Sequence, residues 1–167
     1  MSVTISGSGQ IIKQVIQTVS STFQVVSGTA FVELSSLNTS ITPTNSANKI
    51  LVQVSITFGG PNDLFPAFKL FRGATWIGQS AASGSGQQTT FAVSTSYGGA
   101  GATVNNGLAT FTYLDSPSTT SATTYSVQVS PKRTASNNFS LNKADTINDA
   151  NQCTGLSTMT VYEVAYA

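Results

Sequence analysis

The chain has 167 residues, of which 40% are hydrophobic and only 8% are charged, with a formal net charge of +1. This length suits one domain that can bury a core, and it leaves no room for a second domain of ordinary size. The seven Lys and Arg residues are scattered, whereas a protein that binds DNA phosphates needs a concentrated basic patch. We therefore expect no nucleic-acid partner.

Missing residue types exclude further classes of protein. The chain has no histidine, which removes the usual general base near neutral pH and the commonest transition-metal ligand. Its single cysteine, Cys153, excludes an intrachain disulfide and a cysteine-based zinc site, and we expect it to be a small packed residue. No apolar run approaches the roughly 18 residues that span a bilayer. The sequence therefore predicts neither membrane insertion nor a bound cofactor.

The N-terminal segment differs from the rest of the chain. Residues 2–10 are small and polar and are typical of an arm outside a core. The apolar residues that follow recur at a spacing of three to four, which favours a short amphipathic helix, but they are also good strand formers, which favours a terminal strand. Both alternatives stay open. We predict an attachment segment over residues 1–19 and a β domain over residues 20–167. The apolar residues of this segment are Ile11, Ile12, Val15, Ile16 and Val19.

Strand patterns then follow one another along the chain. Short β segments are predicted over residues 23–27, 31–34 and 38–42. The clearest strand covers residues 49–58, because apolar side chains alternate with polar ones before a turn at residues 59–63. Its predicted inward face consists of Ile50, Val52, Val54, Ile56 and Phe58.

The second half of the chain repeats this pattern. Residues 68–71 and 75–79 flank a tight turn at 72–74 and predict a hairpin. Further strands are predicted over residues 89–96, around 109–113, over 125–130, around 139–141 and over 156–166. In the last strand, Tyr162, Val164 and Tyr166 share one face, and Met159 and Val161 share the other. Residues 81–86 and 98–101 are predicted to be surface loops.

Short strands separated by turns, without a convincing helix, predict an all-β fold. The expected architecture is an antiparallel β-sandwich of the jelly-roll type, in which each strand buries one face between two sheets. Five aromatic residues are assigned to its core. They are Phe58, Phe68, Phe71, Phe91 and Phe111.

Candidate chemistry among the acidic residues is sparse. Asp115 ends a predicted strand, where Asp commonly caps a turn, and Glu163 lies within the last strand, either exposed or turned inward at a subunit contact. Two carboxylates can hydrolyse a sugar, so a hydrolase acting through Asp115 or Glu163 is the lowest-ranked hypothesis. Asp145 and Asp149 lie among asparagines and suit either calcium or a solvated turn, although the spacing matches no EF-hand loop. We predict no catalytic and no metal-binding residue.

Aromatic and amide side chains near turns are the candidate ligand-binding residues. Exposed aromatic rings beside polar loops commonly hold sugars or another subunit. Trp76 suits either such a site or the core, and Tyr162 and Tyr166 suit a contact between subunits. The loops that could bind a ligand carry Asn62, Asp63, Trp76, Asn105 and Asn106.

Several segments between about residues 19 and 166 resemble a domain of marine and cyanobacterial tailed-phage virion proteins, found at the C-terminus of tail-fibre-like chains or as a small virion surface protein. The resemblance implies a non-enzymatic β-sandwich, usually trimeric, on a virus particle. Unlike the fibre version, this chain has almost no shaft before the domain. The segments that carry the resemblance are residues 48–52, 68–73, 112–117, 123–129 and 158–164.

Two functions are expected from these observations. The first is a capsid decoration or cement subunit, a homotrimer on the outer surface of the virion, docked on the major capsid protein or another virion protein through residues 2–19. The contact residues would be Ile11, Ile12, Val15, Ile16, Tyr162 and Tyr166. The alternative is a tail-fibre tip or knob that binds a host-surface receptor or glycan through the loops named above.

Overall fold

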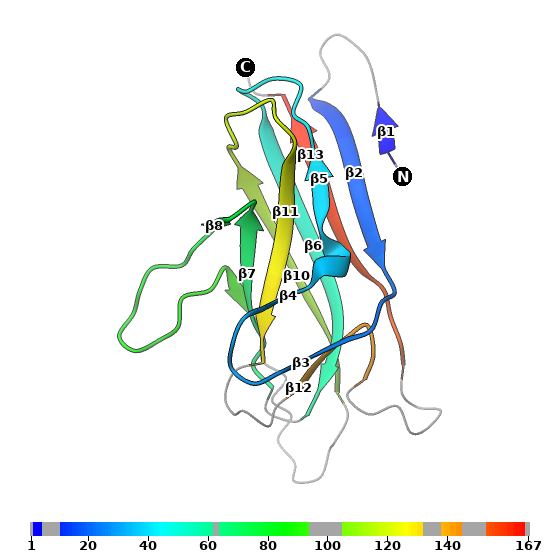
Figure 1. Ribbon diagram of the computed structural model, residues 1–167, viewed down its shortest axis with the longest axis vertical. Helices are drawn as coiled ribbons and strands as arrows, with labels where there is room; N and C mark the ends of the chain where they lie inside the picture. Colours follow the sequence, from blue (N-terminus) through cyan, green and yellow to red (C-terminus); the bar gives the residue numbers. More distant parts are fainter. Residues whose placement is uncertain are drawn as a thin grey trace.

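A computed structural model of the chain describes residues 2–4, 11–61, 64–93, 105–131, 138–144 and 153–165. These residues form two antiparallel sheets and contain no α-helix, only a short 3-10 turn, η1 (Ser35–Leu37). The prediction of an all-β fold made of antiparallel sheets is therefore confirmed, and the arrangement is consistent with a sandwich. Figure 1 places β5, β7 and β11 in front of β6, β10 and β13.

The larger sheet has seven strands and is built around β6 (Lys49–Gly60). β13 (Ser157–Val164) pairs with one side of β6 and β10 (Asn105–Asp115) with the other, since both strands face residues 50–55 of β6. β12 (Asn138–Leu141) pairs with the end of β6, beyond the stretch of β6 that pairs with β13. The other side of β12 pairs with β3 (Gln24–Ser27).

The smaller sheet has six strands and is centred on β11 (Thr123–Ser130) and β7 (Ala67–Arg72). β4 (Val32–Glu33) and β5 (Thr39–Ile41) both pair with β11, and β8 (Thr75–Ile77) and β9 (Phe91–Ala92) both pair with β7. The predicted hairpin is confirmed: Gly73 adopts a φ of +54° between β7 and β8, which an L residue rarely adopts.

The core lies between the two sheets. The five alternate side chains predicted to face inward from β6 are at most 1% exposed, which confirms that strand and its orientation. Phenylalanine rings from both sheets meet here: Phe68 stacks on Phe91 at 4.4 Å and meets the edge of Phe139 at 5.8 Å between ring centres. Phe58 and Phe68 are buried as predicted, and the partly buried Phe91 and Phe111 pack against the core. The core assignment of Phe71 is wrong, because it follows the inward-facing Leu70 on β7 and therefore lies on the other face of the sheet.

The N-terminal apolar segment is a strand. β2 (Ile12–Ser20) pairs with β13 along nearly its whole length, and β1 (Ser2–Thr4) pairs with its other side. An isolated helix of this length is marginal, whereas a strand here gains a ladder of backbone hydrogen bonds and packs Ile16 against the core. β2 therefore crosses the boundary expected between residues 19 and 20 (Figure 1).

Other predictions meet mixed outcomes. The strands expected near residues 23–27, 31–34, 38–42, 125–130, 139–141 and 156–166 are present, with ends that differ by one or two residues, as β3, β4, β5, β11, β12 and β13. Of the strand expected over 89–96, residues 89–93 are described, and only Phe91–Ala92 form a strand. Residues 94–96 are outside the described residues. The prediction that Cys153 is packed is wrong: the residue is exposed, next to the isolated bridge between Lys143 and Thr154.

Candidate functional site

The predicted attachment residues Val15 and Tyr162 lie side by side on the outer face of the larger sheet. The register pairs Val15 of β2 with Tyr162 of β13, Tyr162 with Leu51 of β6, and Leu51 with Leu114 of β10. These four residues alternate with inward-facing neighbours, so their side chains share the outer face. They form a continuous apolar row across four strands, the outer apolar row, in which Leu114 is 55% exposed and the others are half-buried.

The other predicted contact residues divide between the two faces. Ile11 and Ile12, at the start of β2, are 69% and 40% exposed, and Ile12 pairs with Val164 beside the outer apolar row. Ile16 faces inward and packs against the core, so its prediction as a surface contact residue is wrong. The period-two alternation of a strand puts Ile16 opposite to Val15, whereas a helix would have brought them together. Tyr166 is outside the described residues.

The neighbouring row on the same face is polar but uncharged. It runs through Gln17, Thr160, Gln53 and Thr112 in register. Its side chains bond across the strands: Gln17 Nε2 donates to Thr160 Oγ1 at 3.0 Å, and the Tyr162 hydroxyl donates to Gln53 Oε1 at 3.3 Å. This face therefore presents apolar and amide groups, with no charged residue in either row.

The predicted ligand-binding residues are not brought together. Asn106 and Asn105 pair with Gly59 and Gly60 at one end of the larger sheet, and the side chain of Asn106 is exposed. Trp76 lies on the other sheet, where it pairs with Phe71 between β8 and β7. Asn62 and Asp63 are outside the described residues, so the loop that carries them is not placed.

Trp76 is held in place by polar contacts. Its Nε1 donates to Thr90 Oγ1 at 3.0 Å, and the Lys69 ammonium lies 3.9 Å from the ring centre. The same ammonium lies 4.2 Å from the ring of Phe31, so Lys69 covers one face of the indole. A cation in this position is attracted to the ring, and that face is not free for a sugar to stack on.

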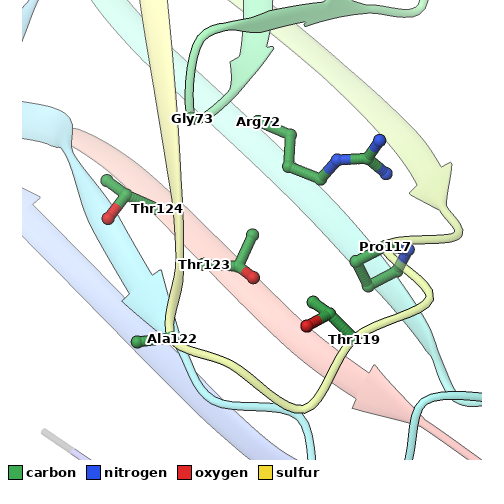
Figure 2. Close-up of a pocket in the computed structure, with 7 residues that line it drawn as sticks. All are labelled: Arg72, Gly73, Pro117, Thr119, Ala122, Thr123 and Thr124. Atoms are coloured by element: carbon green, nitrogen blue, oxygen red, sulfur yellow. The ribbon is translucent and has the colours of Figure 1, made fainter.

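A pocket that the sequence did not indicate lies at the end of the sandwich near Arg72. Its volume is about 330 Å³, and residues from the β7–β8 turn, the 116–122 connection and the start of β11 line it. Figure 2 shows Arg72 extending toward Pro117, with Thr119, Ala122 and Thr123 on the neighbouring stretch of chain. The lining residues are Arg72, Gly73, Pro117, Thr119, Ala122, Thr123 and Thr124.

Arg72 is anchored on the wall of this pocket by Asp115. Its Nη1 donates to both carboxylate oxygens, at 3.0 and 3.1 Å, and to the Ser116 carbonyl at 3.1 Å. The buried Tyr125 hydroxyl donates to Asp115 Oδ2 at 2.7 Å. Burial raises the pKa of Tyr125, and the hydrogen bond to Asp115 raises it further. Asp115 is thus an ion-pair partner, not only the turn cap that its position suggested.

Glu163 is enclosed by hydrogen-bond donors. Its Oε1 accepts from the Thr44 amide at 2.6 Å, the Thr44 hydroxyl at 2.7 Å and Asn48 Nδ2 at 2.7 Å, while Oε2 accepts from Gln14 Nε2 at 2.7 Å. The residue has no exposed surface. The exposed alternative is therefore wrong: Glu163 is turned inward, although into its own subunit, where β2 and the 42–48 connection satisfy it.

The two inward carboxylates lie on either side of the same residue of β6. Asp115 and Glu163 flank Ile50 in one cross-strand row, but each is bonded to donors of the chain itself. Within the described residues, no group of three or more potential metal ligands is present, and no helix is long and apolar enough to cross a membrane.

The acidic and asparagine cluster that suits either calcium or a solvated turn is only partly described. Asp145 and Asp149 are outside the described residues. Asn142 is buried and serves the fold: its Nδ2 donates to the carbonyls of Ser20 and Thr22, and its Oδ1 accepts from the Ser157 hydroxyl at 2.6 Å.

Comparison of the sequence with models of known protein families and with curated proteins found no match.

Proposed function

We propose that the chain is a non-enzymatic virion structural protein, a jelly-roll decoration or cement subunit that acts as a homotrimer and docks on another virion protein through its N-terminal segment. The outer apolar row carries this proposal. It joins the predicted contact residues Val15 and Tyr162 to Leu51 and Leu114 on the outer face, in a row that contains no charged residue. Apolar contact of this kind does not weaken as ionic strength rises, because it involves no screened charge pair.

The edge of the same sheet supports docking by the N-terminal segment. β1 has only three residues and is the outermost strand next to β2. A short edge strand can be replaced by, or extended with, a strand of another protein, which adds backbone hydrogen bonds at an existing edge. Ile11 and Ile12 lie at the start of β2, so a strand added there would lie next to exposed apolar groups.

The proposal predicts that the chain is present in purified particles of the virus that encodes it. Quantitative mass spectrometry of those particles gives the copy number: hundreds of copies indicate a head protein and a handful indicate a tail or vertex protein. Absence from the particles contradicts the proposal. For docking, the variant Leu51→Lys/Leu114→Lys is expected to rebind to particles that lack the protein at least about ten-fold more weakly than wild type.

Two further variants sharpen this test. Gln53→Lys puts the same charge on the neighbouring polar row and is expected to rebind like wild type, since Gln53 is exposed outside the outer apolar row. Deletion of residues 1–10 removes β1 but keeps β2, which the sheet needs, and is expected to reduce rebinding. If the lysine double variant and the deletion both rebind as strongly as wild type, the proposed docking surface is contradicted.

The pocket beside Arg72 favours a second function, recognition of a host-surface glycan. Its volume suits a monosaccharide, and its wall combines a guanidinium, threonine hydroxyls and the Pro117 ring. Ser118, between two lining residues, has a φ of +52°, a strained conformation of the kind found at binding sites.

If the pocket recognises a glycan, the wild-type protein should bind saturably to a glycan array. A substitution that fills the pocket with a large side chain should abolish or weaken that binding. Ala122→Trp places a large ring into the pocket from an exposed position and is expected to lower binding at least about ten-fold. Ala82→Trp, on the exposed connection between β8 and β9, is the matched control and should bind like wild type. If the wild-type protein shows no saturable binding to any glycan, the second function is contradicted and only the structural role remains.

A further inference from the structure

Among the strands that the structure describes, β10 is a long edge strand. It pairs with β6 from Asn105 to Asp115 in unbroken register, whereas β13 and β2 pair through a bulge. On its other side β10 pairs with no strand among the described residues, and no loop backbone described here bonds to it. Edge strands are usually protected by charge, proline, a bulge or short length. Between Asn106 and Leu114, β10 has none of these.

The inward side of β10 is incompletely covered. Inward-facing side chains of β6 are at most 1% exposed, and Ala109 of β10 is also buried. Phe111 and Tyr113, which face the same core, stay only half-buried, although Phe111 stacks on Phe91 at 4.0 Å between ring centres. The core is therefore still open along this edge, so a further strand beside β10 would bury apolar surface as well as backbone groups.

The sequence of β10 is nearly symmetric about Phe111. Threonines lie one residue away on each side, and leucines lie three residues away on each side, in the order Leu-Ala-Thr-Phe-Thr-Tyr-Leu. All four of these flanking residues are exposed, with Leu108 at 63% and Leu114 at 55%. If two such strands pair antiparallel around Phe111, Thr110 faces Thr112 and Leu108 faces Leu114. These are favourable cross-strand pairs, and no like charges meet.

We propose that β10 is a contact between two copies of this chain, which pair antiparallel about a two-fold axis at Phe111 and join their larger sheets into one. A two-fold contact is self-complementary, and the symmetric side-chain order of β10 fits this requirement. A strand from an unrelated partner would not require such symmetry in β10. The contact does not depend on the virion role. In a trimeric protein it links one trimer to the next, and without a trimer it makes a dimer.

The first test is register-specific disulfide formation in a Cys153→Ser background. Directly opposed residues of antiparallel strands have Cα atoms about 4.5–5.5 Å apart, which a disulfide spans. An equimolar mixture of Thr110→Cys chains and Thr112→Cys chains, one of them carrying a tag, is expected to form a mixed disulfide under mild oxidation. Each variant alone should cross-link at least about ten-fold less, because its own copies then lie diagonally at about 7–8 Å. Equal cross-linking in all three samples overturns the proposal.

The second test measures association without cysteines. Thr110→Lys/Thr112→Lys sets lysines against lysines across the proposed contact, while both positions are exposed in the single subunit. Analytical ultracentrifugation is expected to show at least about ten-fold weaker association than wild type, with Gln53→Lys as the control for an added charge on the same face. Unchanged association of the double variant, or a wild-type protein that is monomeric up to about 100 µM, overturns the proposal.

Discussion

Replacing Glu163 with alanine is expected to lower the free energy of unfolding by about 3–5 kcal/mol, the largest loss predicted for a polar residue of this chain. The substitution leaves the Thr44 amide and the side chains of Gln14, Thr44 and Asn48 facing an apolar methyl group. Buried donors without an acceptor each carry a desolvation cost, and the cavity adds to it. Urea denaturation of wild type and variant at neutral pH measures the difference.

Glu33 provides the matched control. It is also a strand glutamate that accepts a side-chain hydrogen bond, from Asn38 Nδ2 at 2.6 Å, but it is exposed. Water replaces the carboxylate there, so Glu33→Ala should change the free energy of unfolding by less than about 1 kcal/mol. Similar losses at positions 33 and 163 would show that the enclosed carboxylate contributes nothing beyond a surface hydrogen bond.

The effect of Glu163 depends on pH in one direction. Burial by itself raises the pKa of Glu163, but the hydrogen bonds that its oxygens accept lower it by more, so it lies below the ordinary value of 4.5. A carboxyl with a lowered pKa in the folded state stabilises fully above 4.5, and that contribution is lost as the pH falls through the folded-state pKa. The stability difference between wild type and Glu163→Ala should therefore shrink on acidification from about pH 7 to about pH 3. A constant difference across this range contradicts the assignment of a charged, hydrogen-bonded carboxylate.

Local sequence patterns were sufficient for most of the strands but not for β2 or for the surfaces that the strands form together. The alternation in β6 and the Gly73 turn are properties of neighbouring residues, and both were predicted correctly. β2 was ambiguous because its apolar residues fit either period, and only its partner β13, more than 130 residues away, decides the outcome. The exposure of Cys153 likewise depends on the folded domain, where the residue lies next to the bridge between Lys143 and Thr154.

The candidate sites depend on register and on residues far apart in the sequence. The outer apolar row needs the alignment of four strands, and a shift of one residue would turn each of its side chains inward. Glu163 is satisfied by side chains more than 100 residues away. Nothing in the local sequence of either group marks these contacts. By contrast, the symmetric order of β10 is visible in the sequence, but it gains meaning only when β10 is known to be an edge strand.

Replacing Asp115 with alanine is expected to lower the free energy of unfolding by about 3 kcal/mol. Its carboxylate accepts from the Tyr125 hydroxyl and from Arg72, and the side chain is only 6% exposed. The two donors are affected unequally. Arg72 is 28% exposed and can be hydrated after the substitution, but Tyr125 is fully buried and its hydroxyl would lose its acceptor. Most of the loss therefore originates at the tyrosine.

This inequality predicts a change of sign in a double-mutant cycle. In the wild-type background, Tyr125→Phe removes a satisfied hydrogen bond and should cost about 1 kcal/mol. In the Asp115→Ala background, the same substitution removes an unsatisfied buried hydroxyl and should raise the free energy of unfolding by about 1 kcal/mol. Burial raises the pKa of Tyr125, so the hydroxyl remains a donor throughout a measurement near neutral pH. If Tyr125→Phe destabilises both backgrounds equally, the hydroxyl and the carboxylate are not coupled, and Asp115 acts mainly by holding Arg72 at the pocket wall.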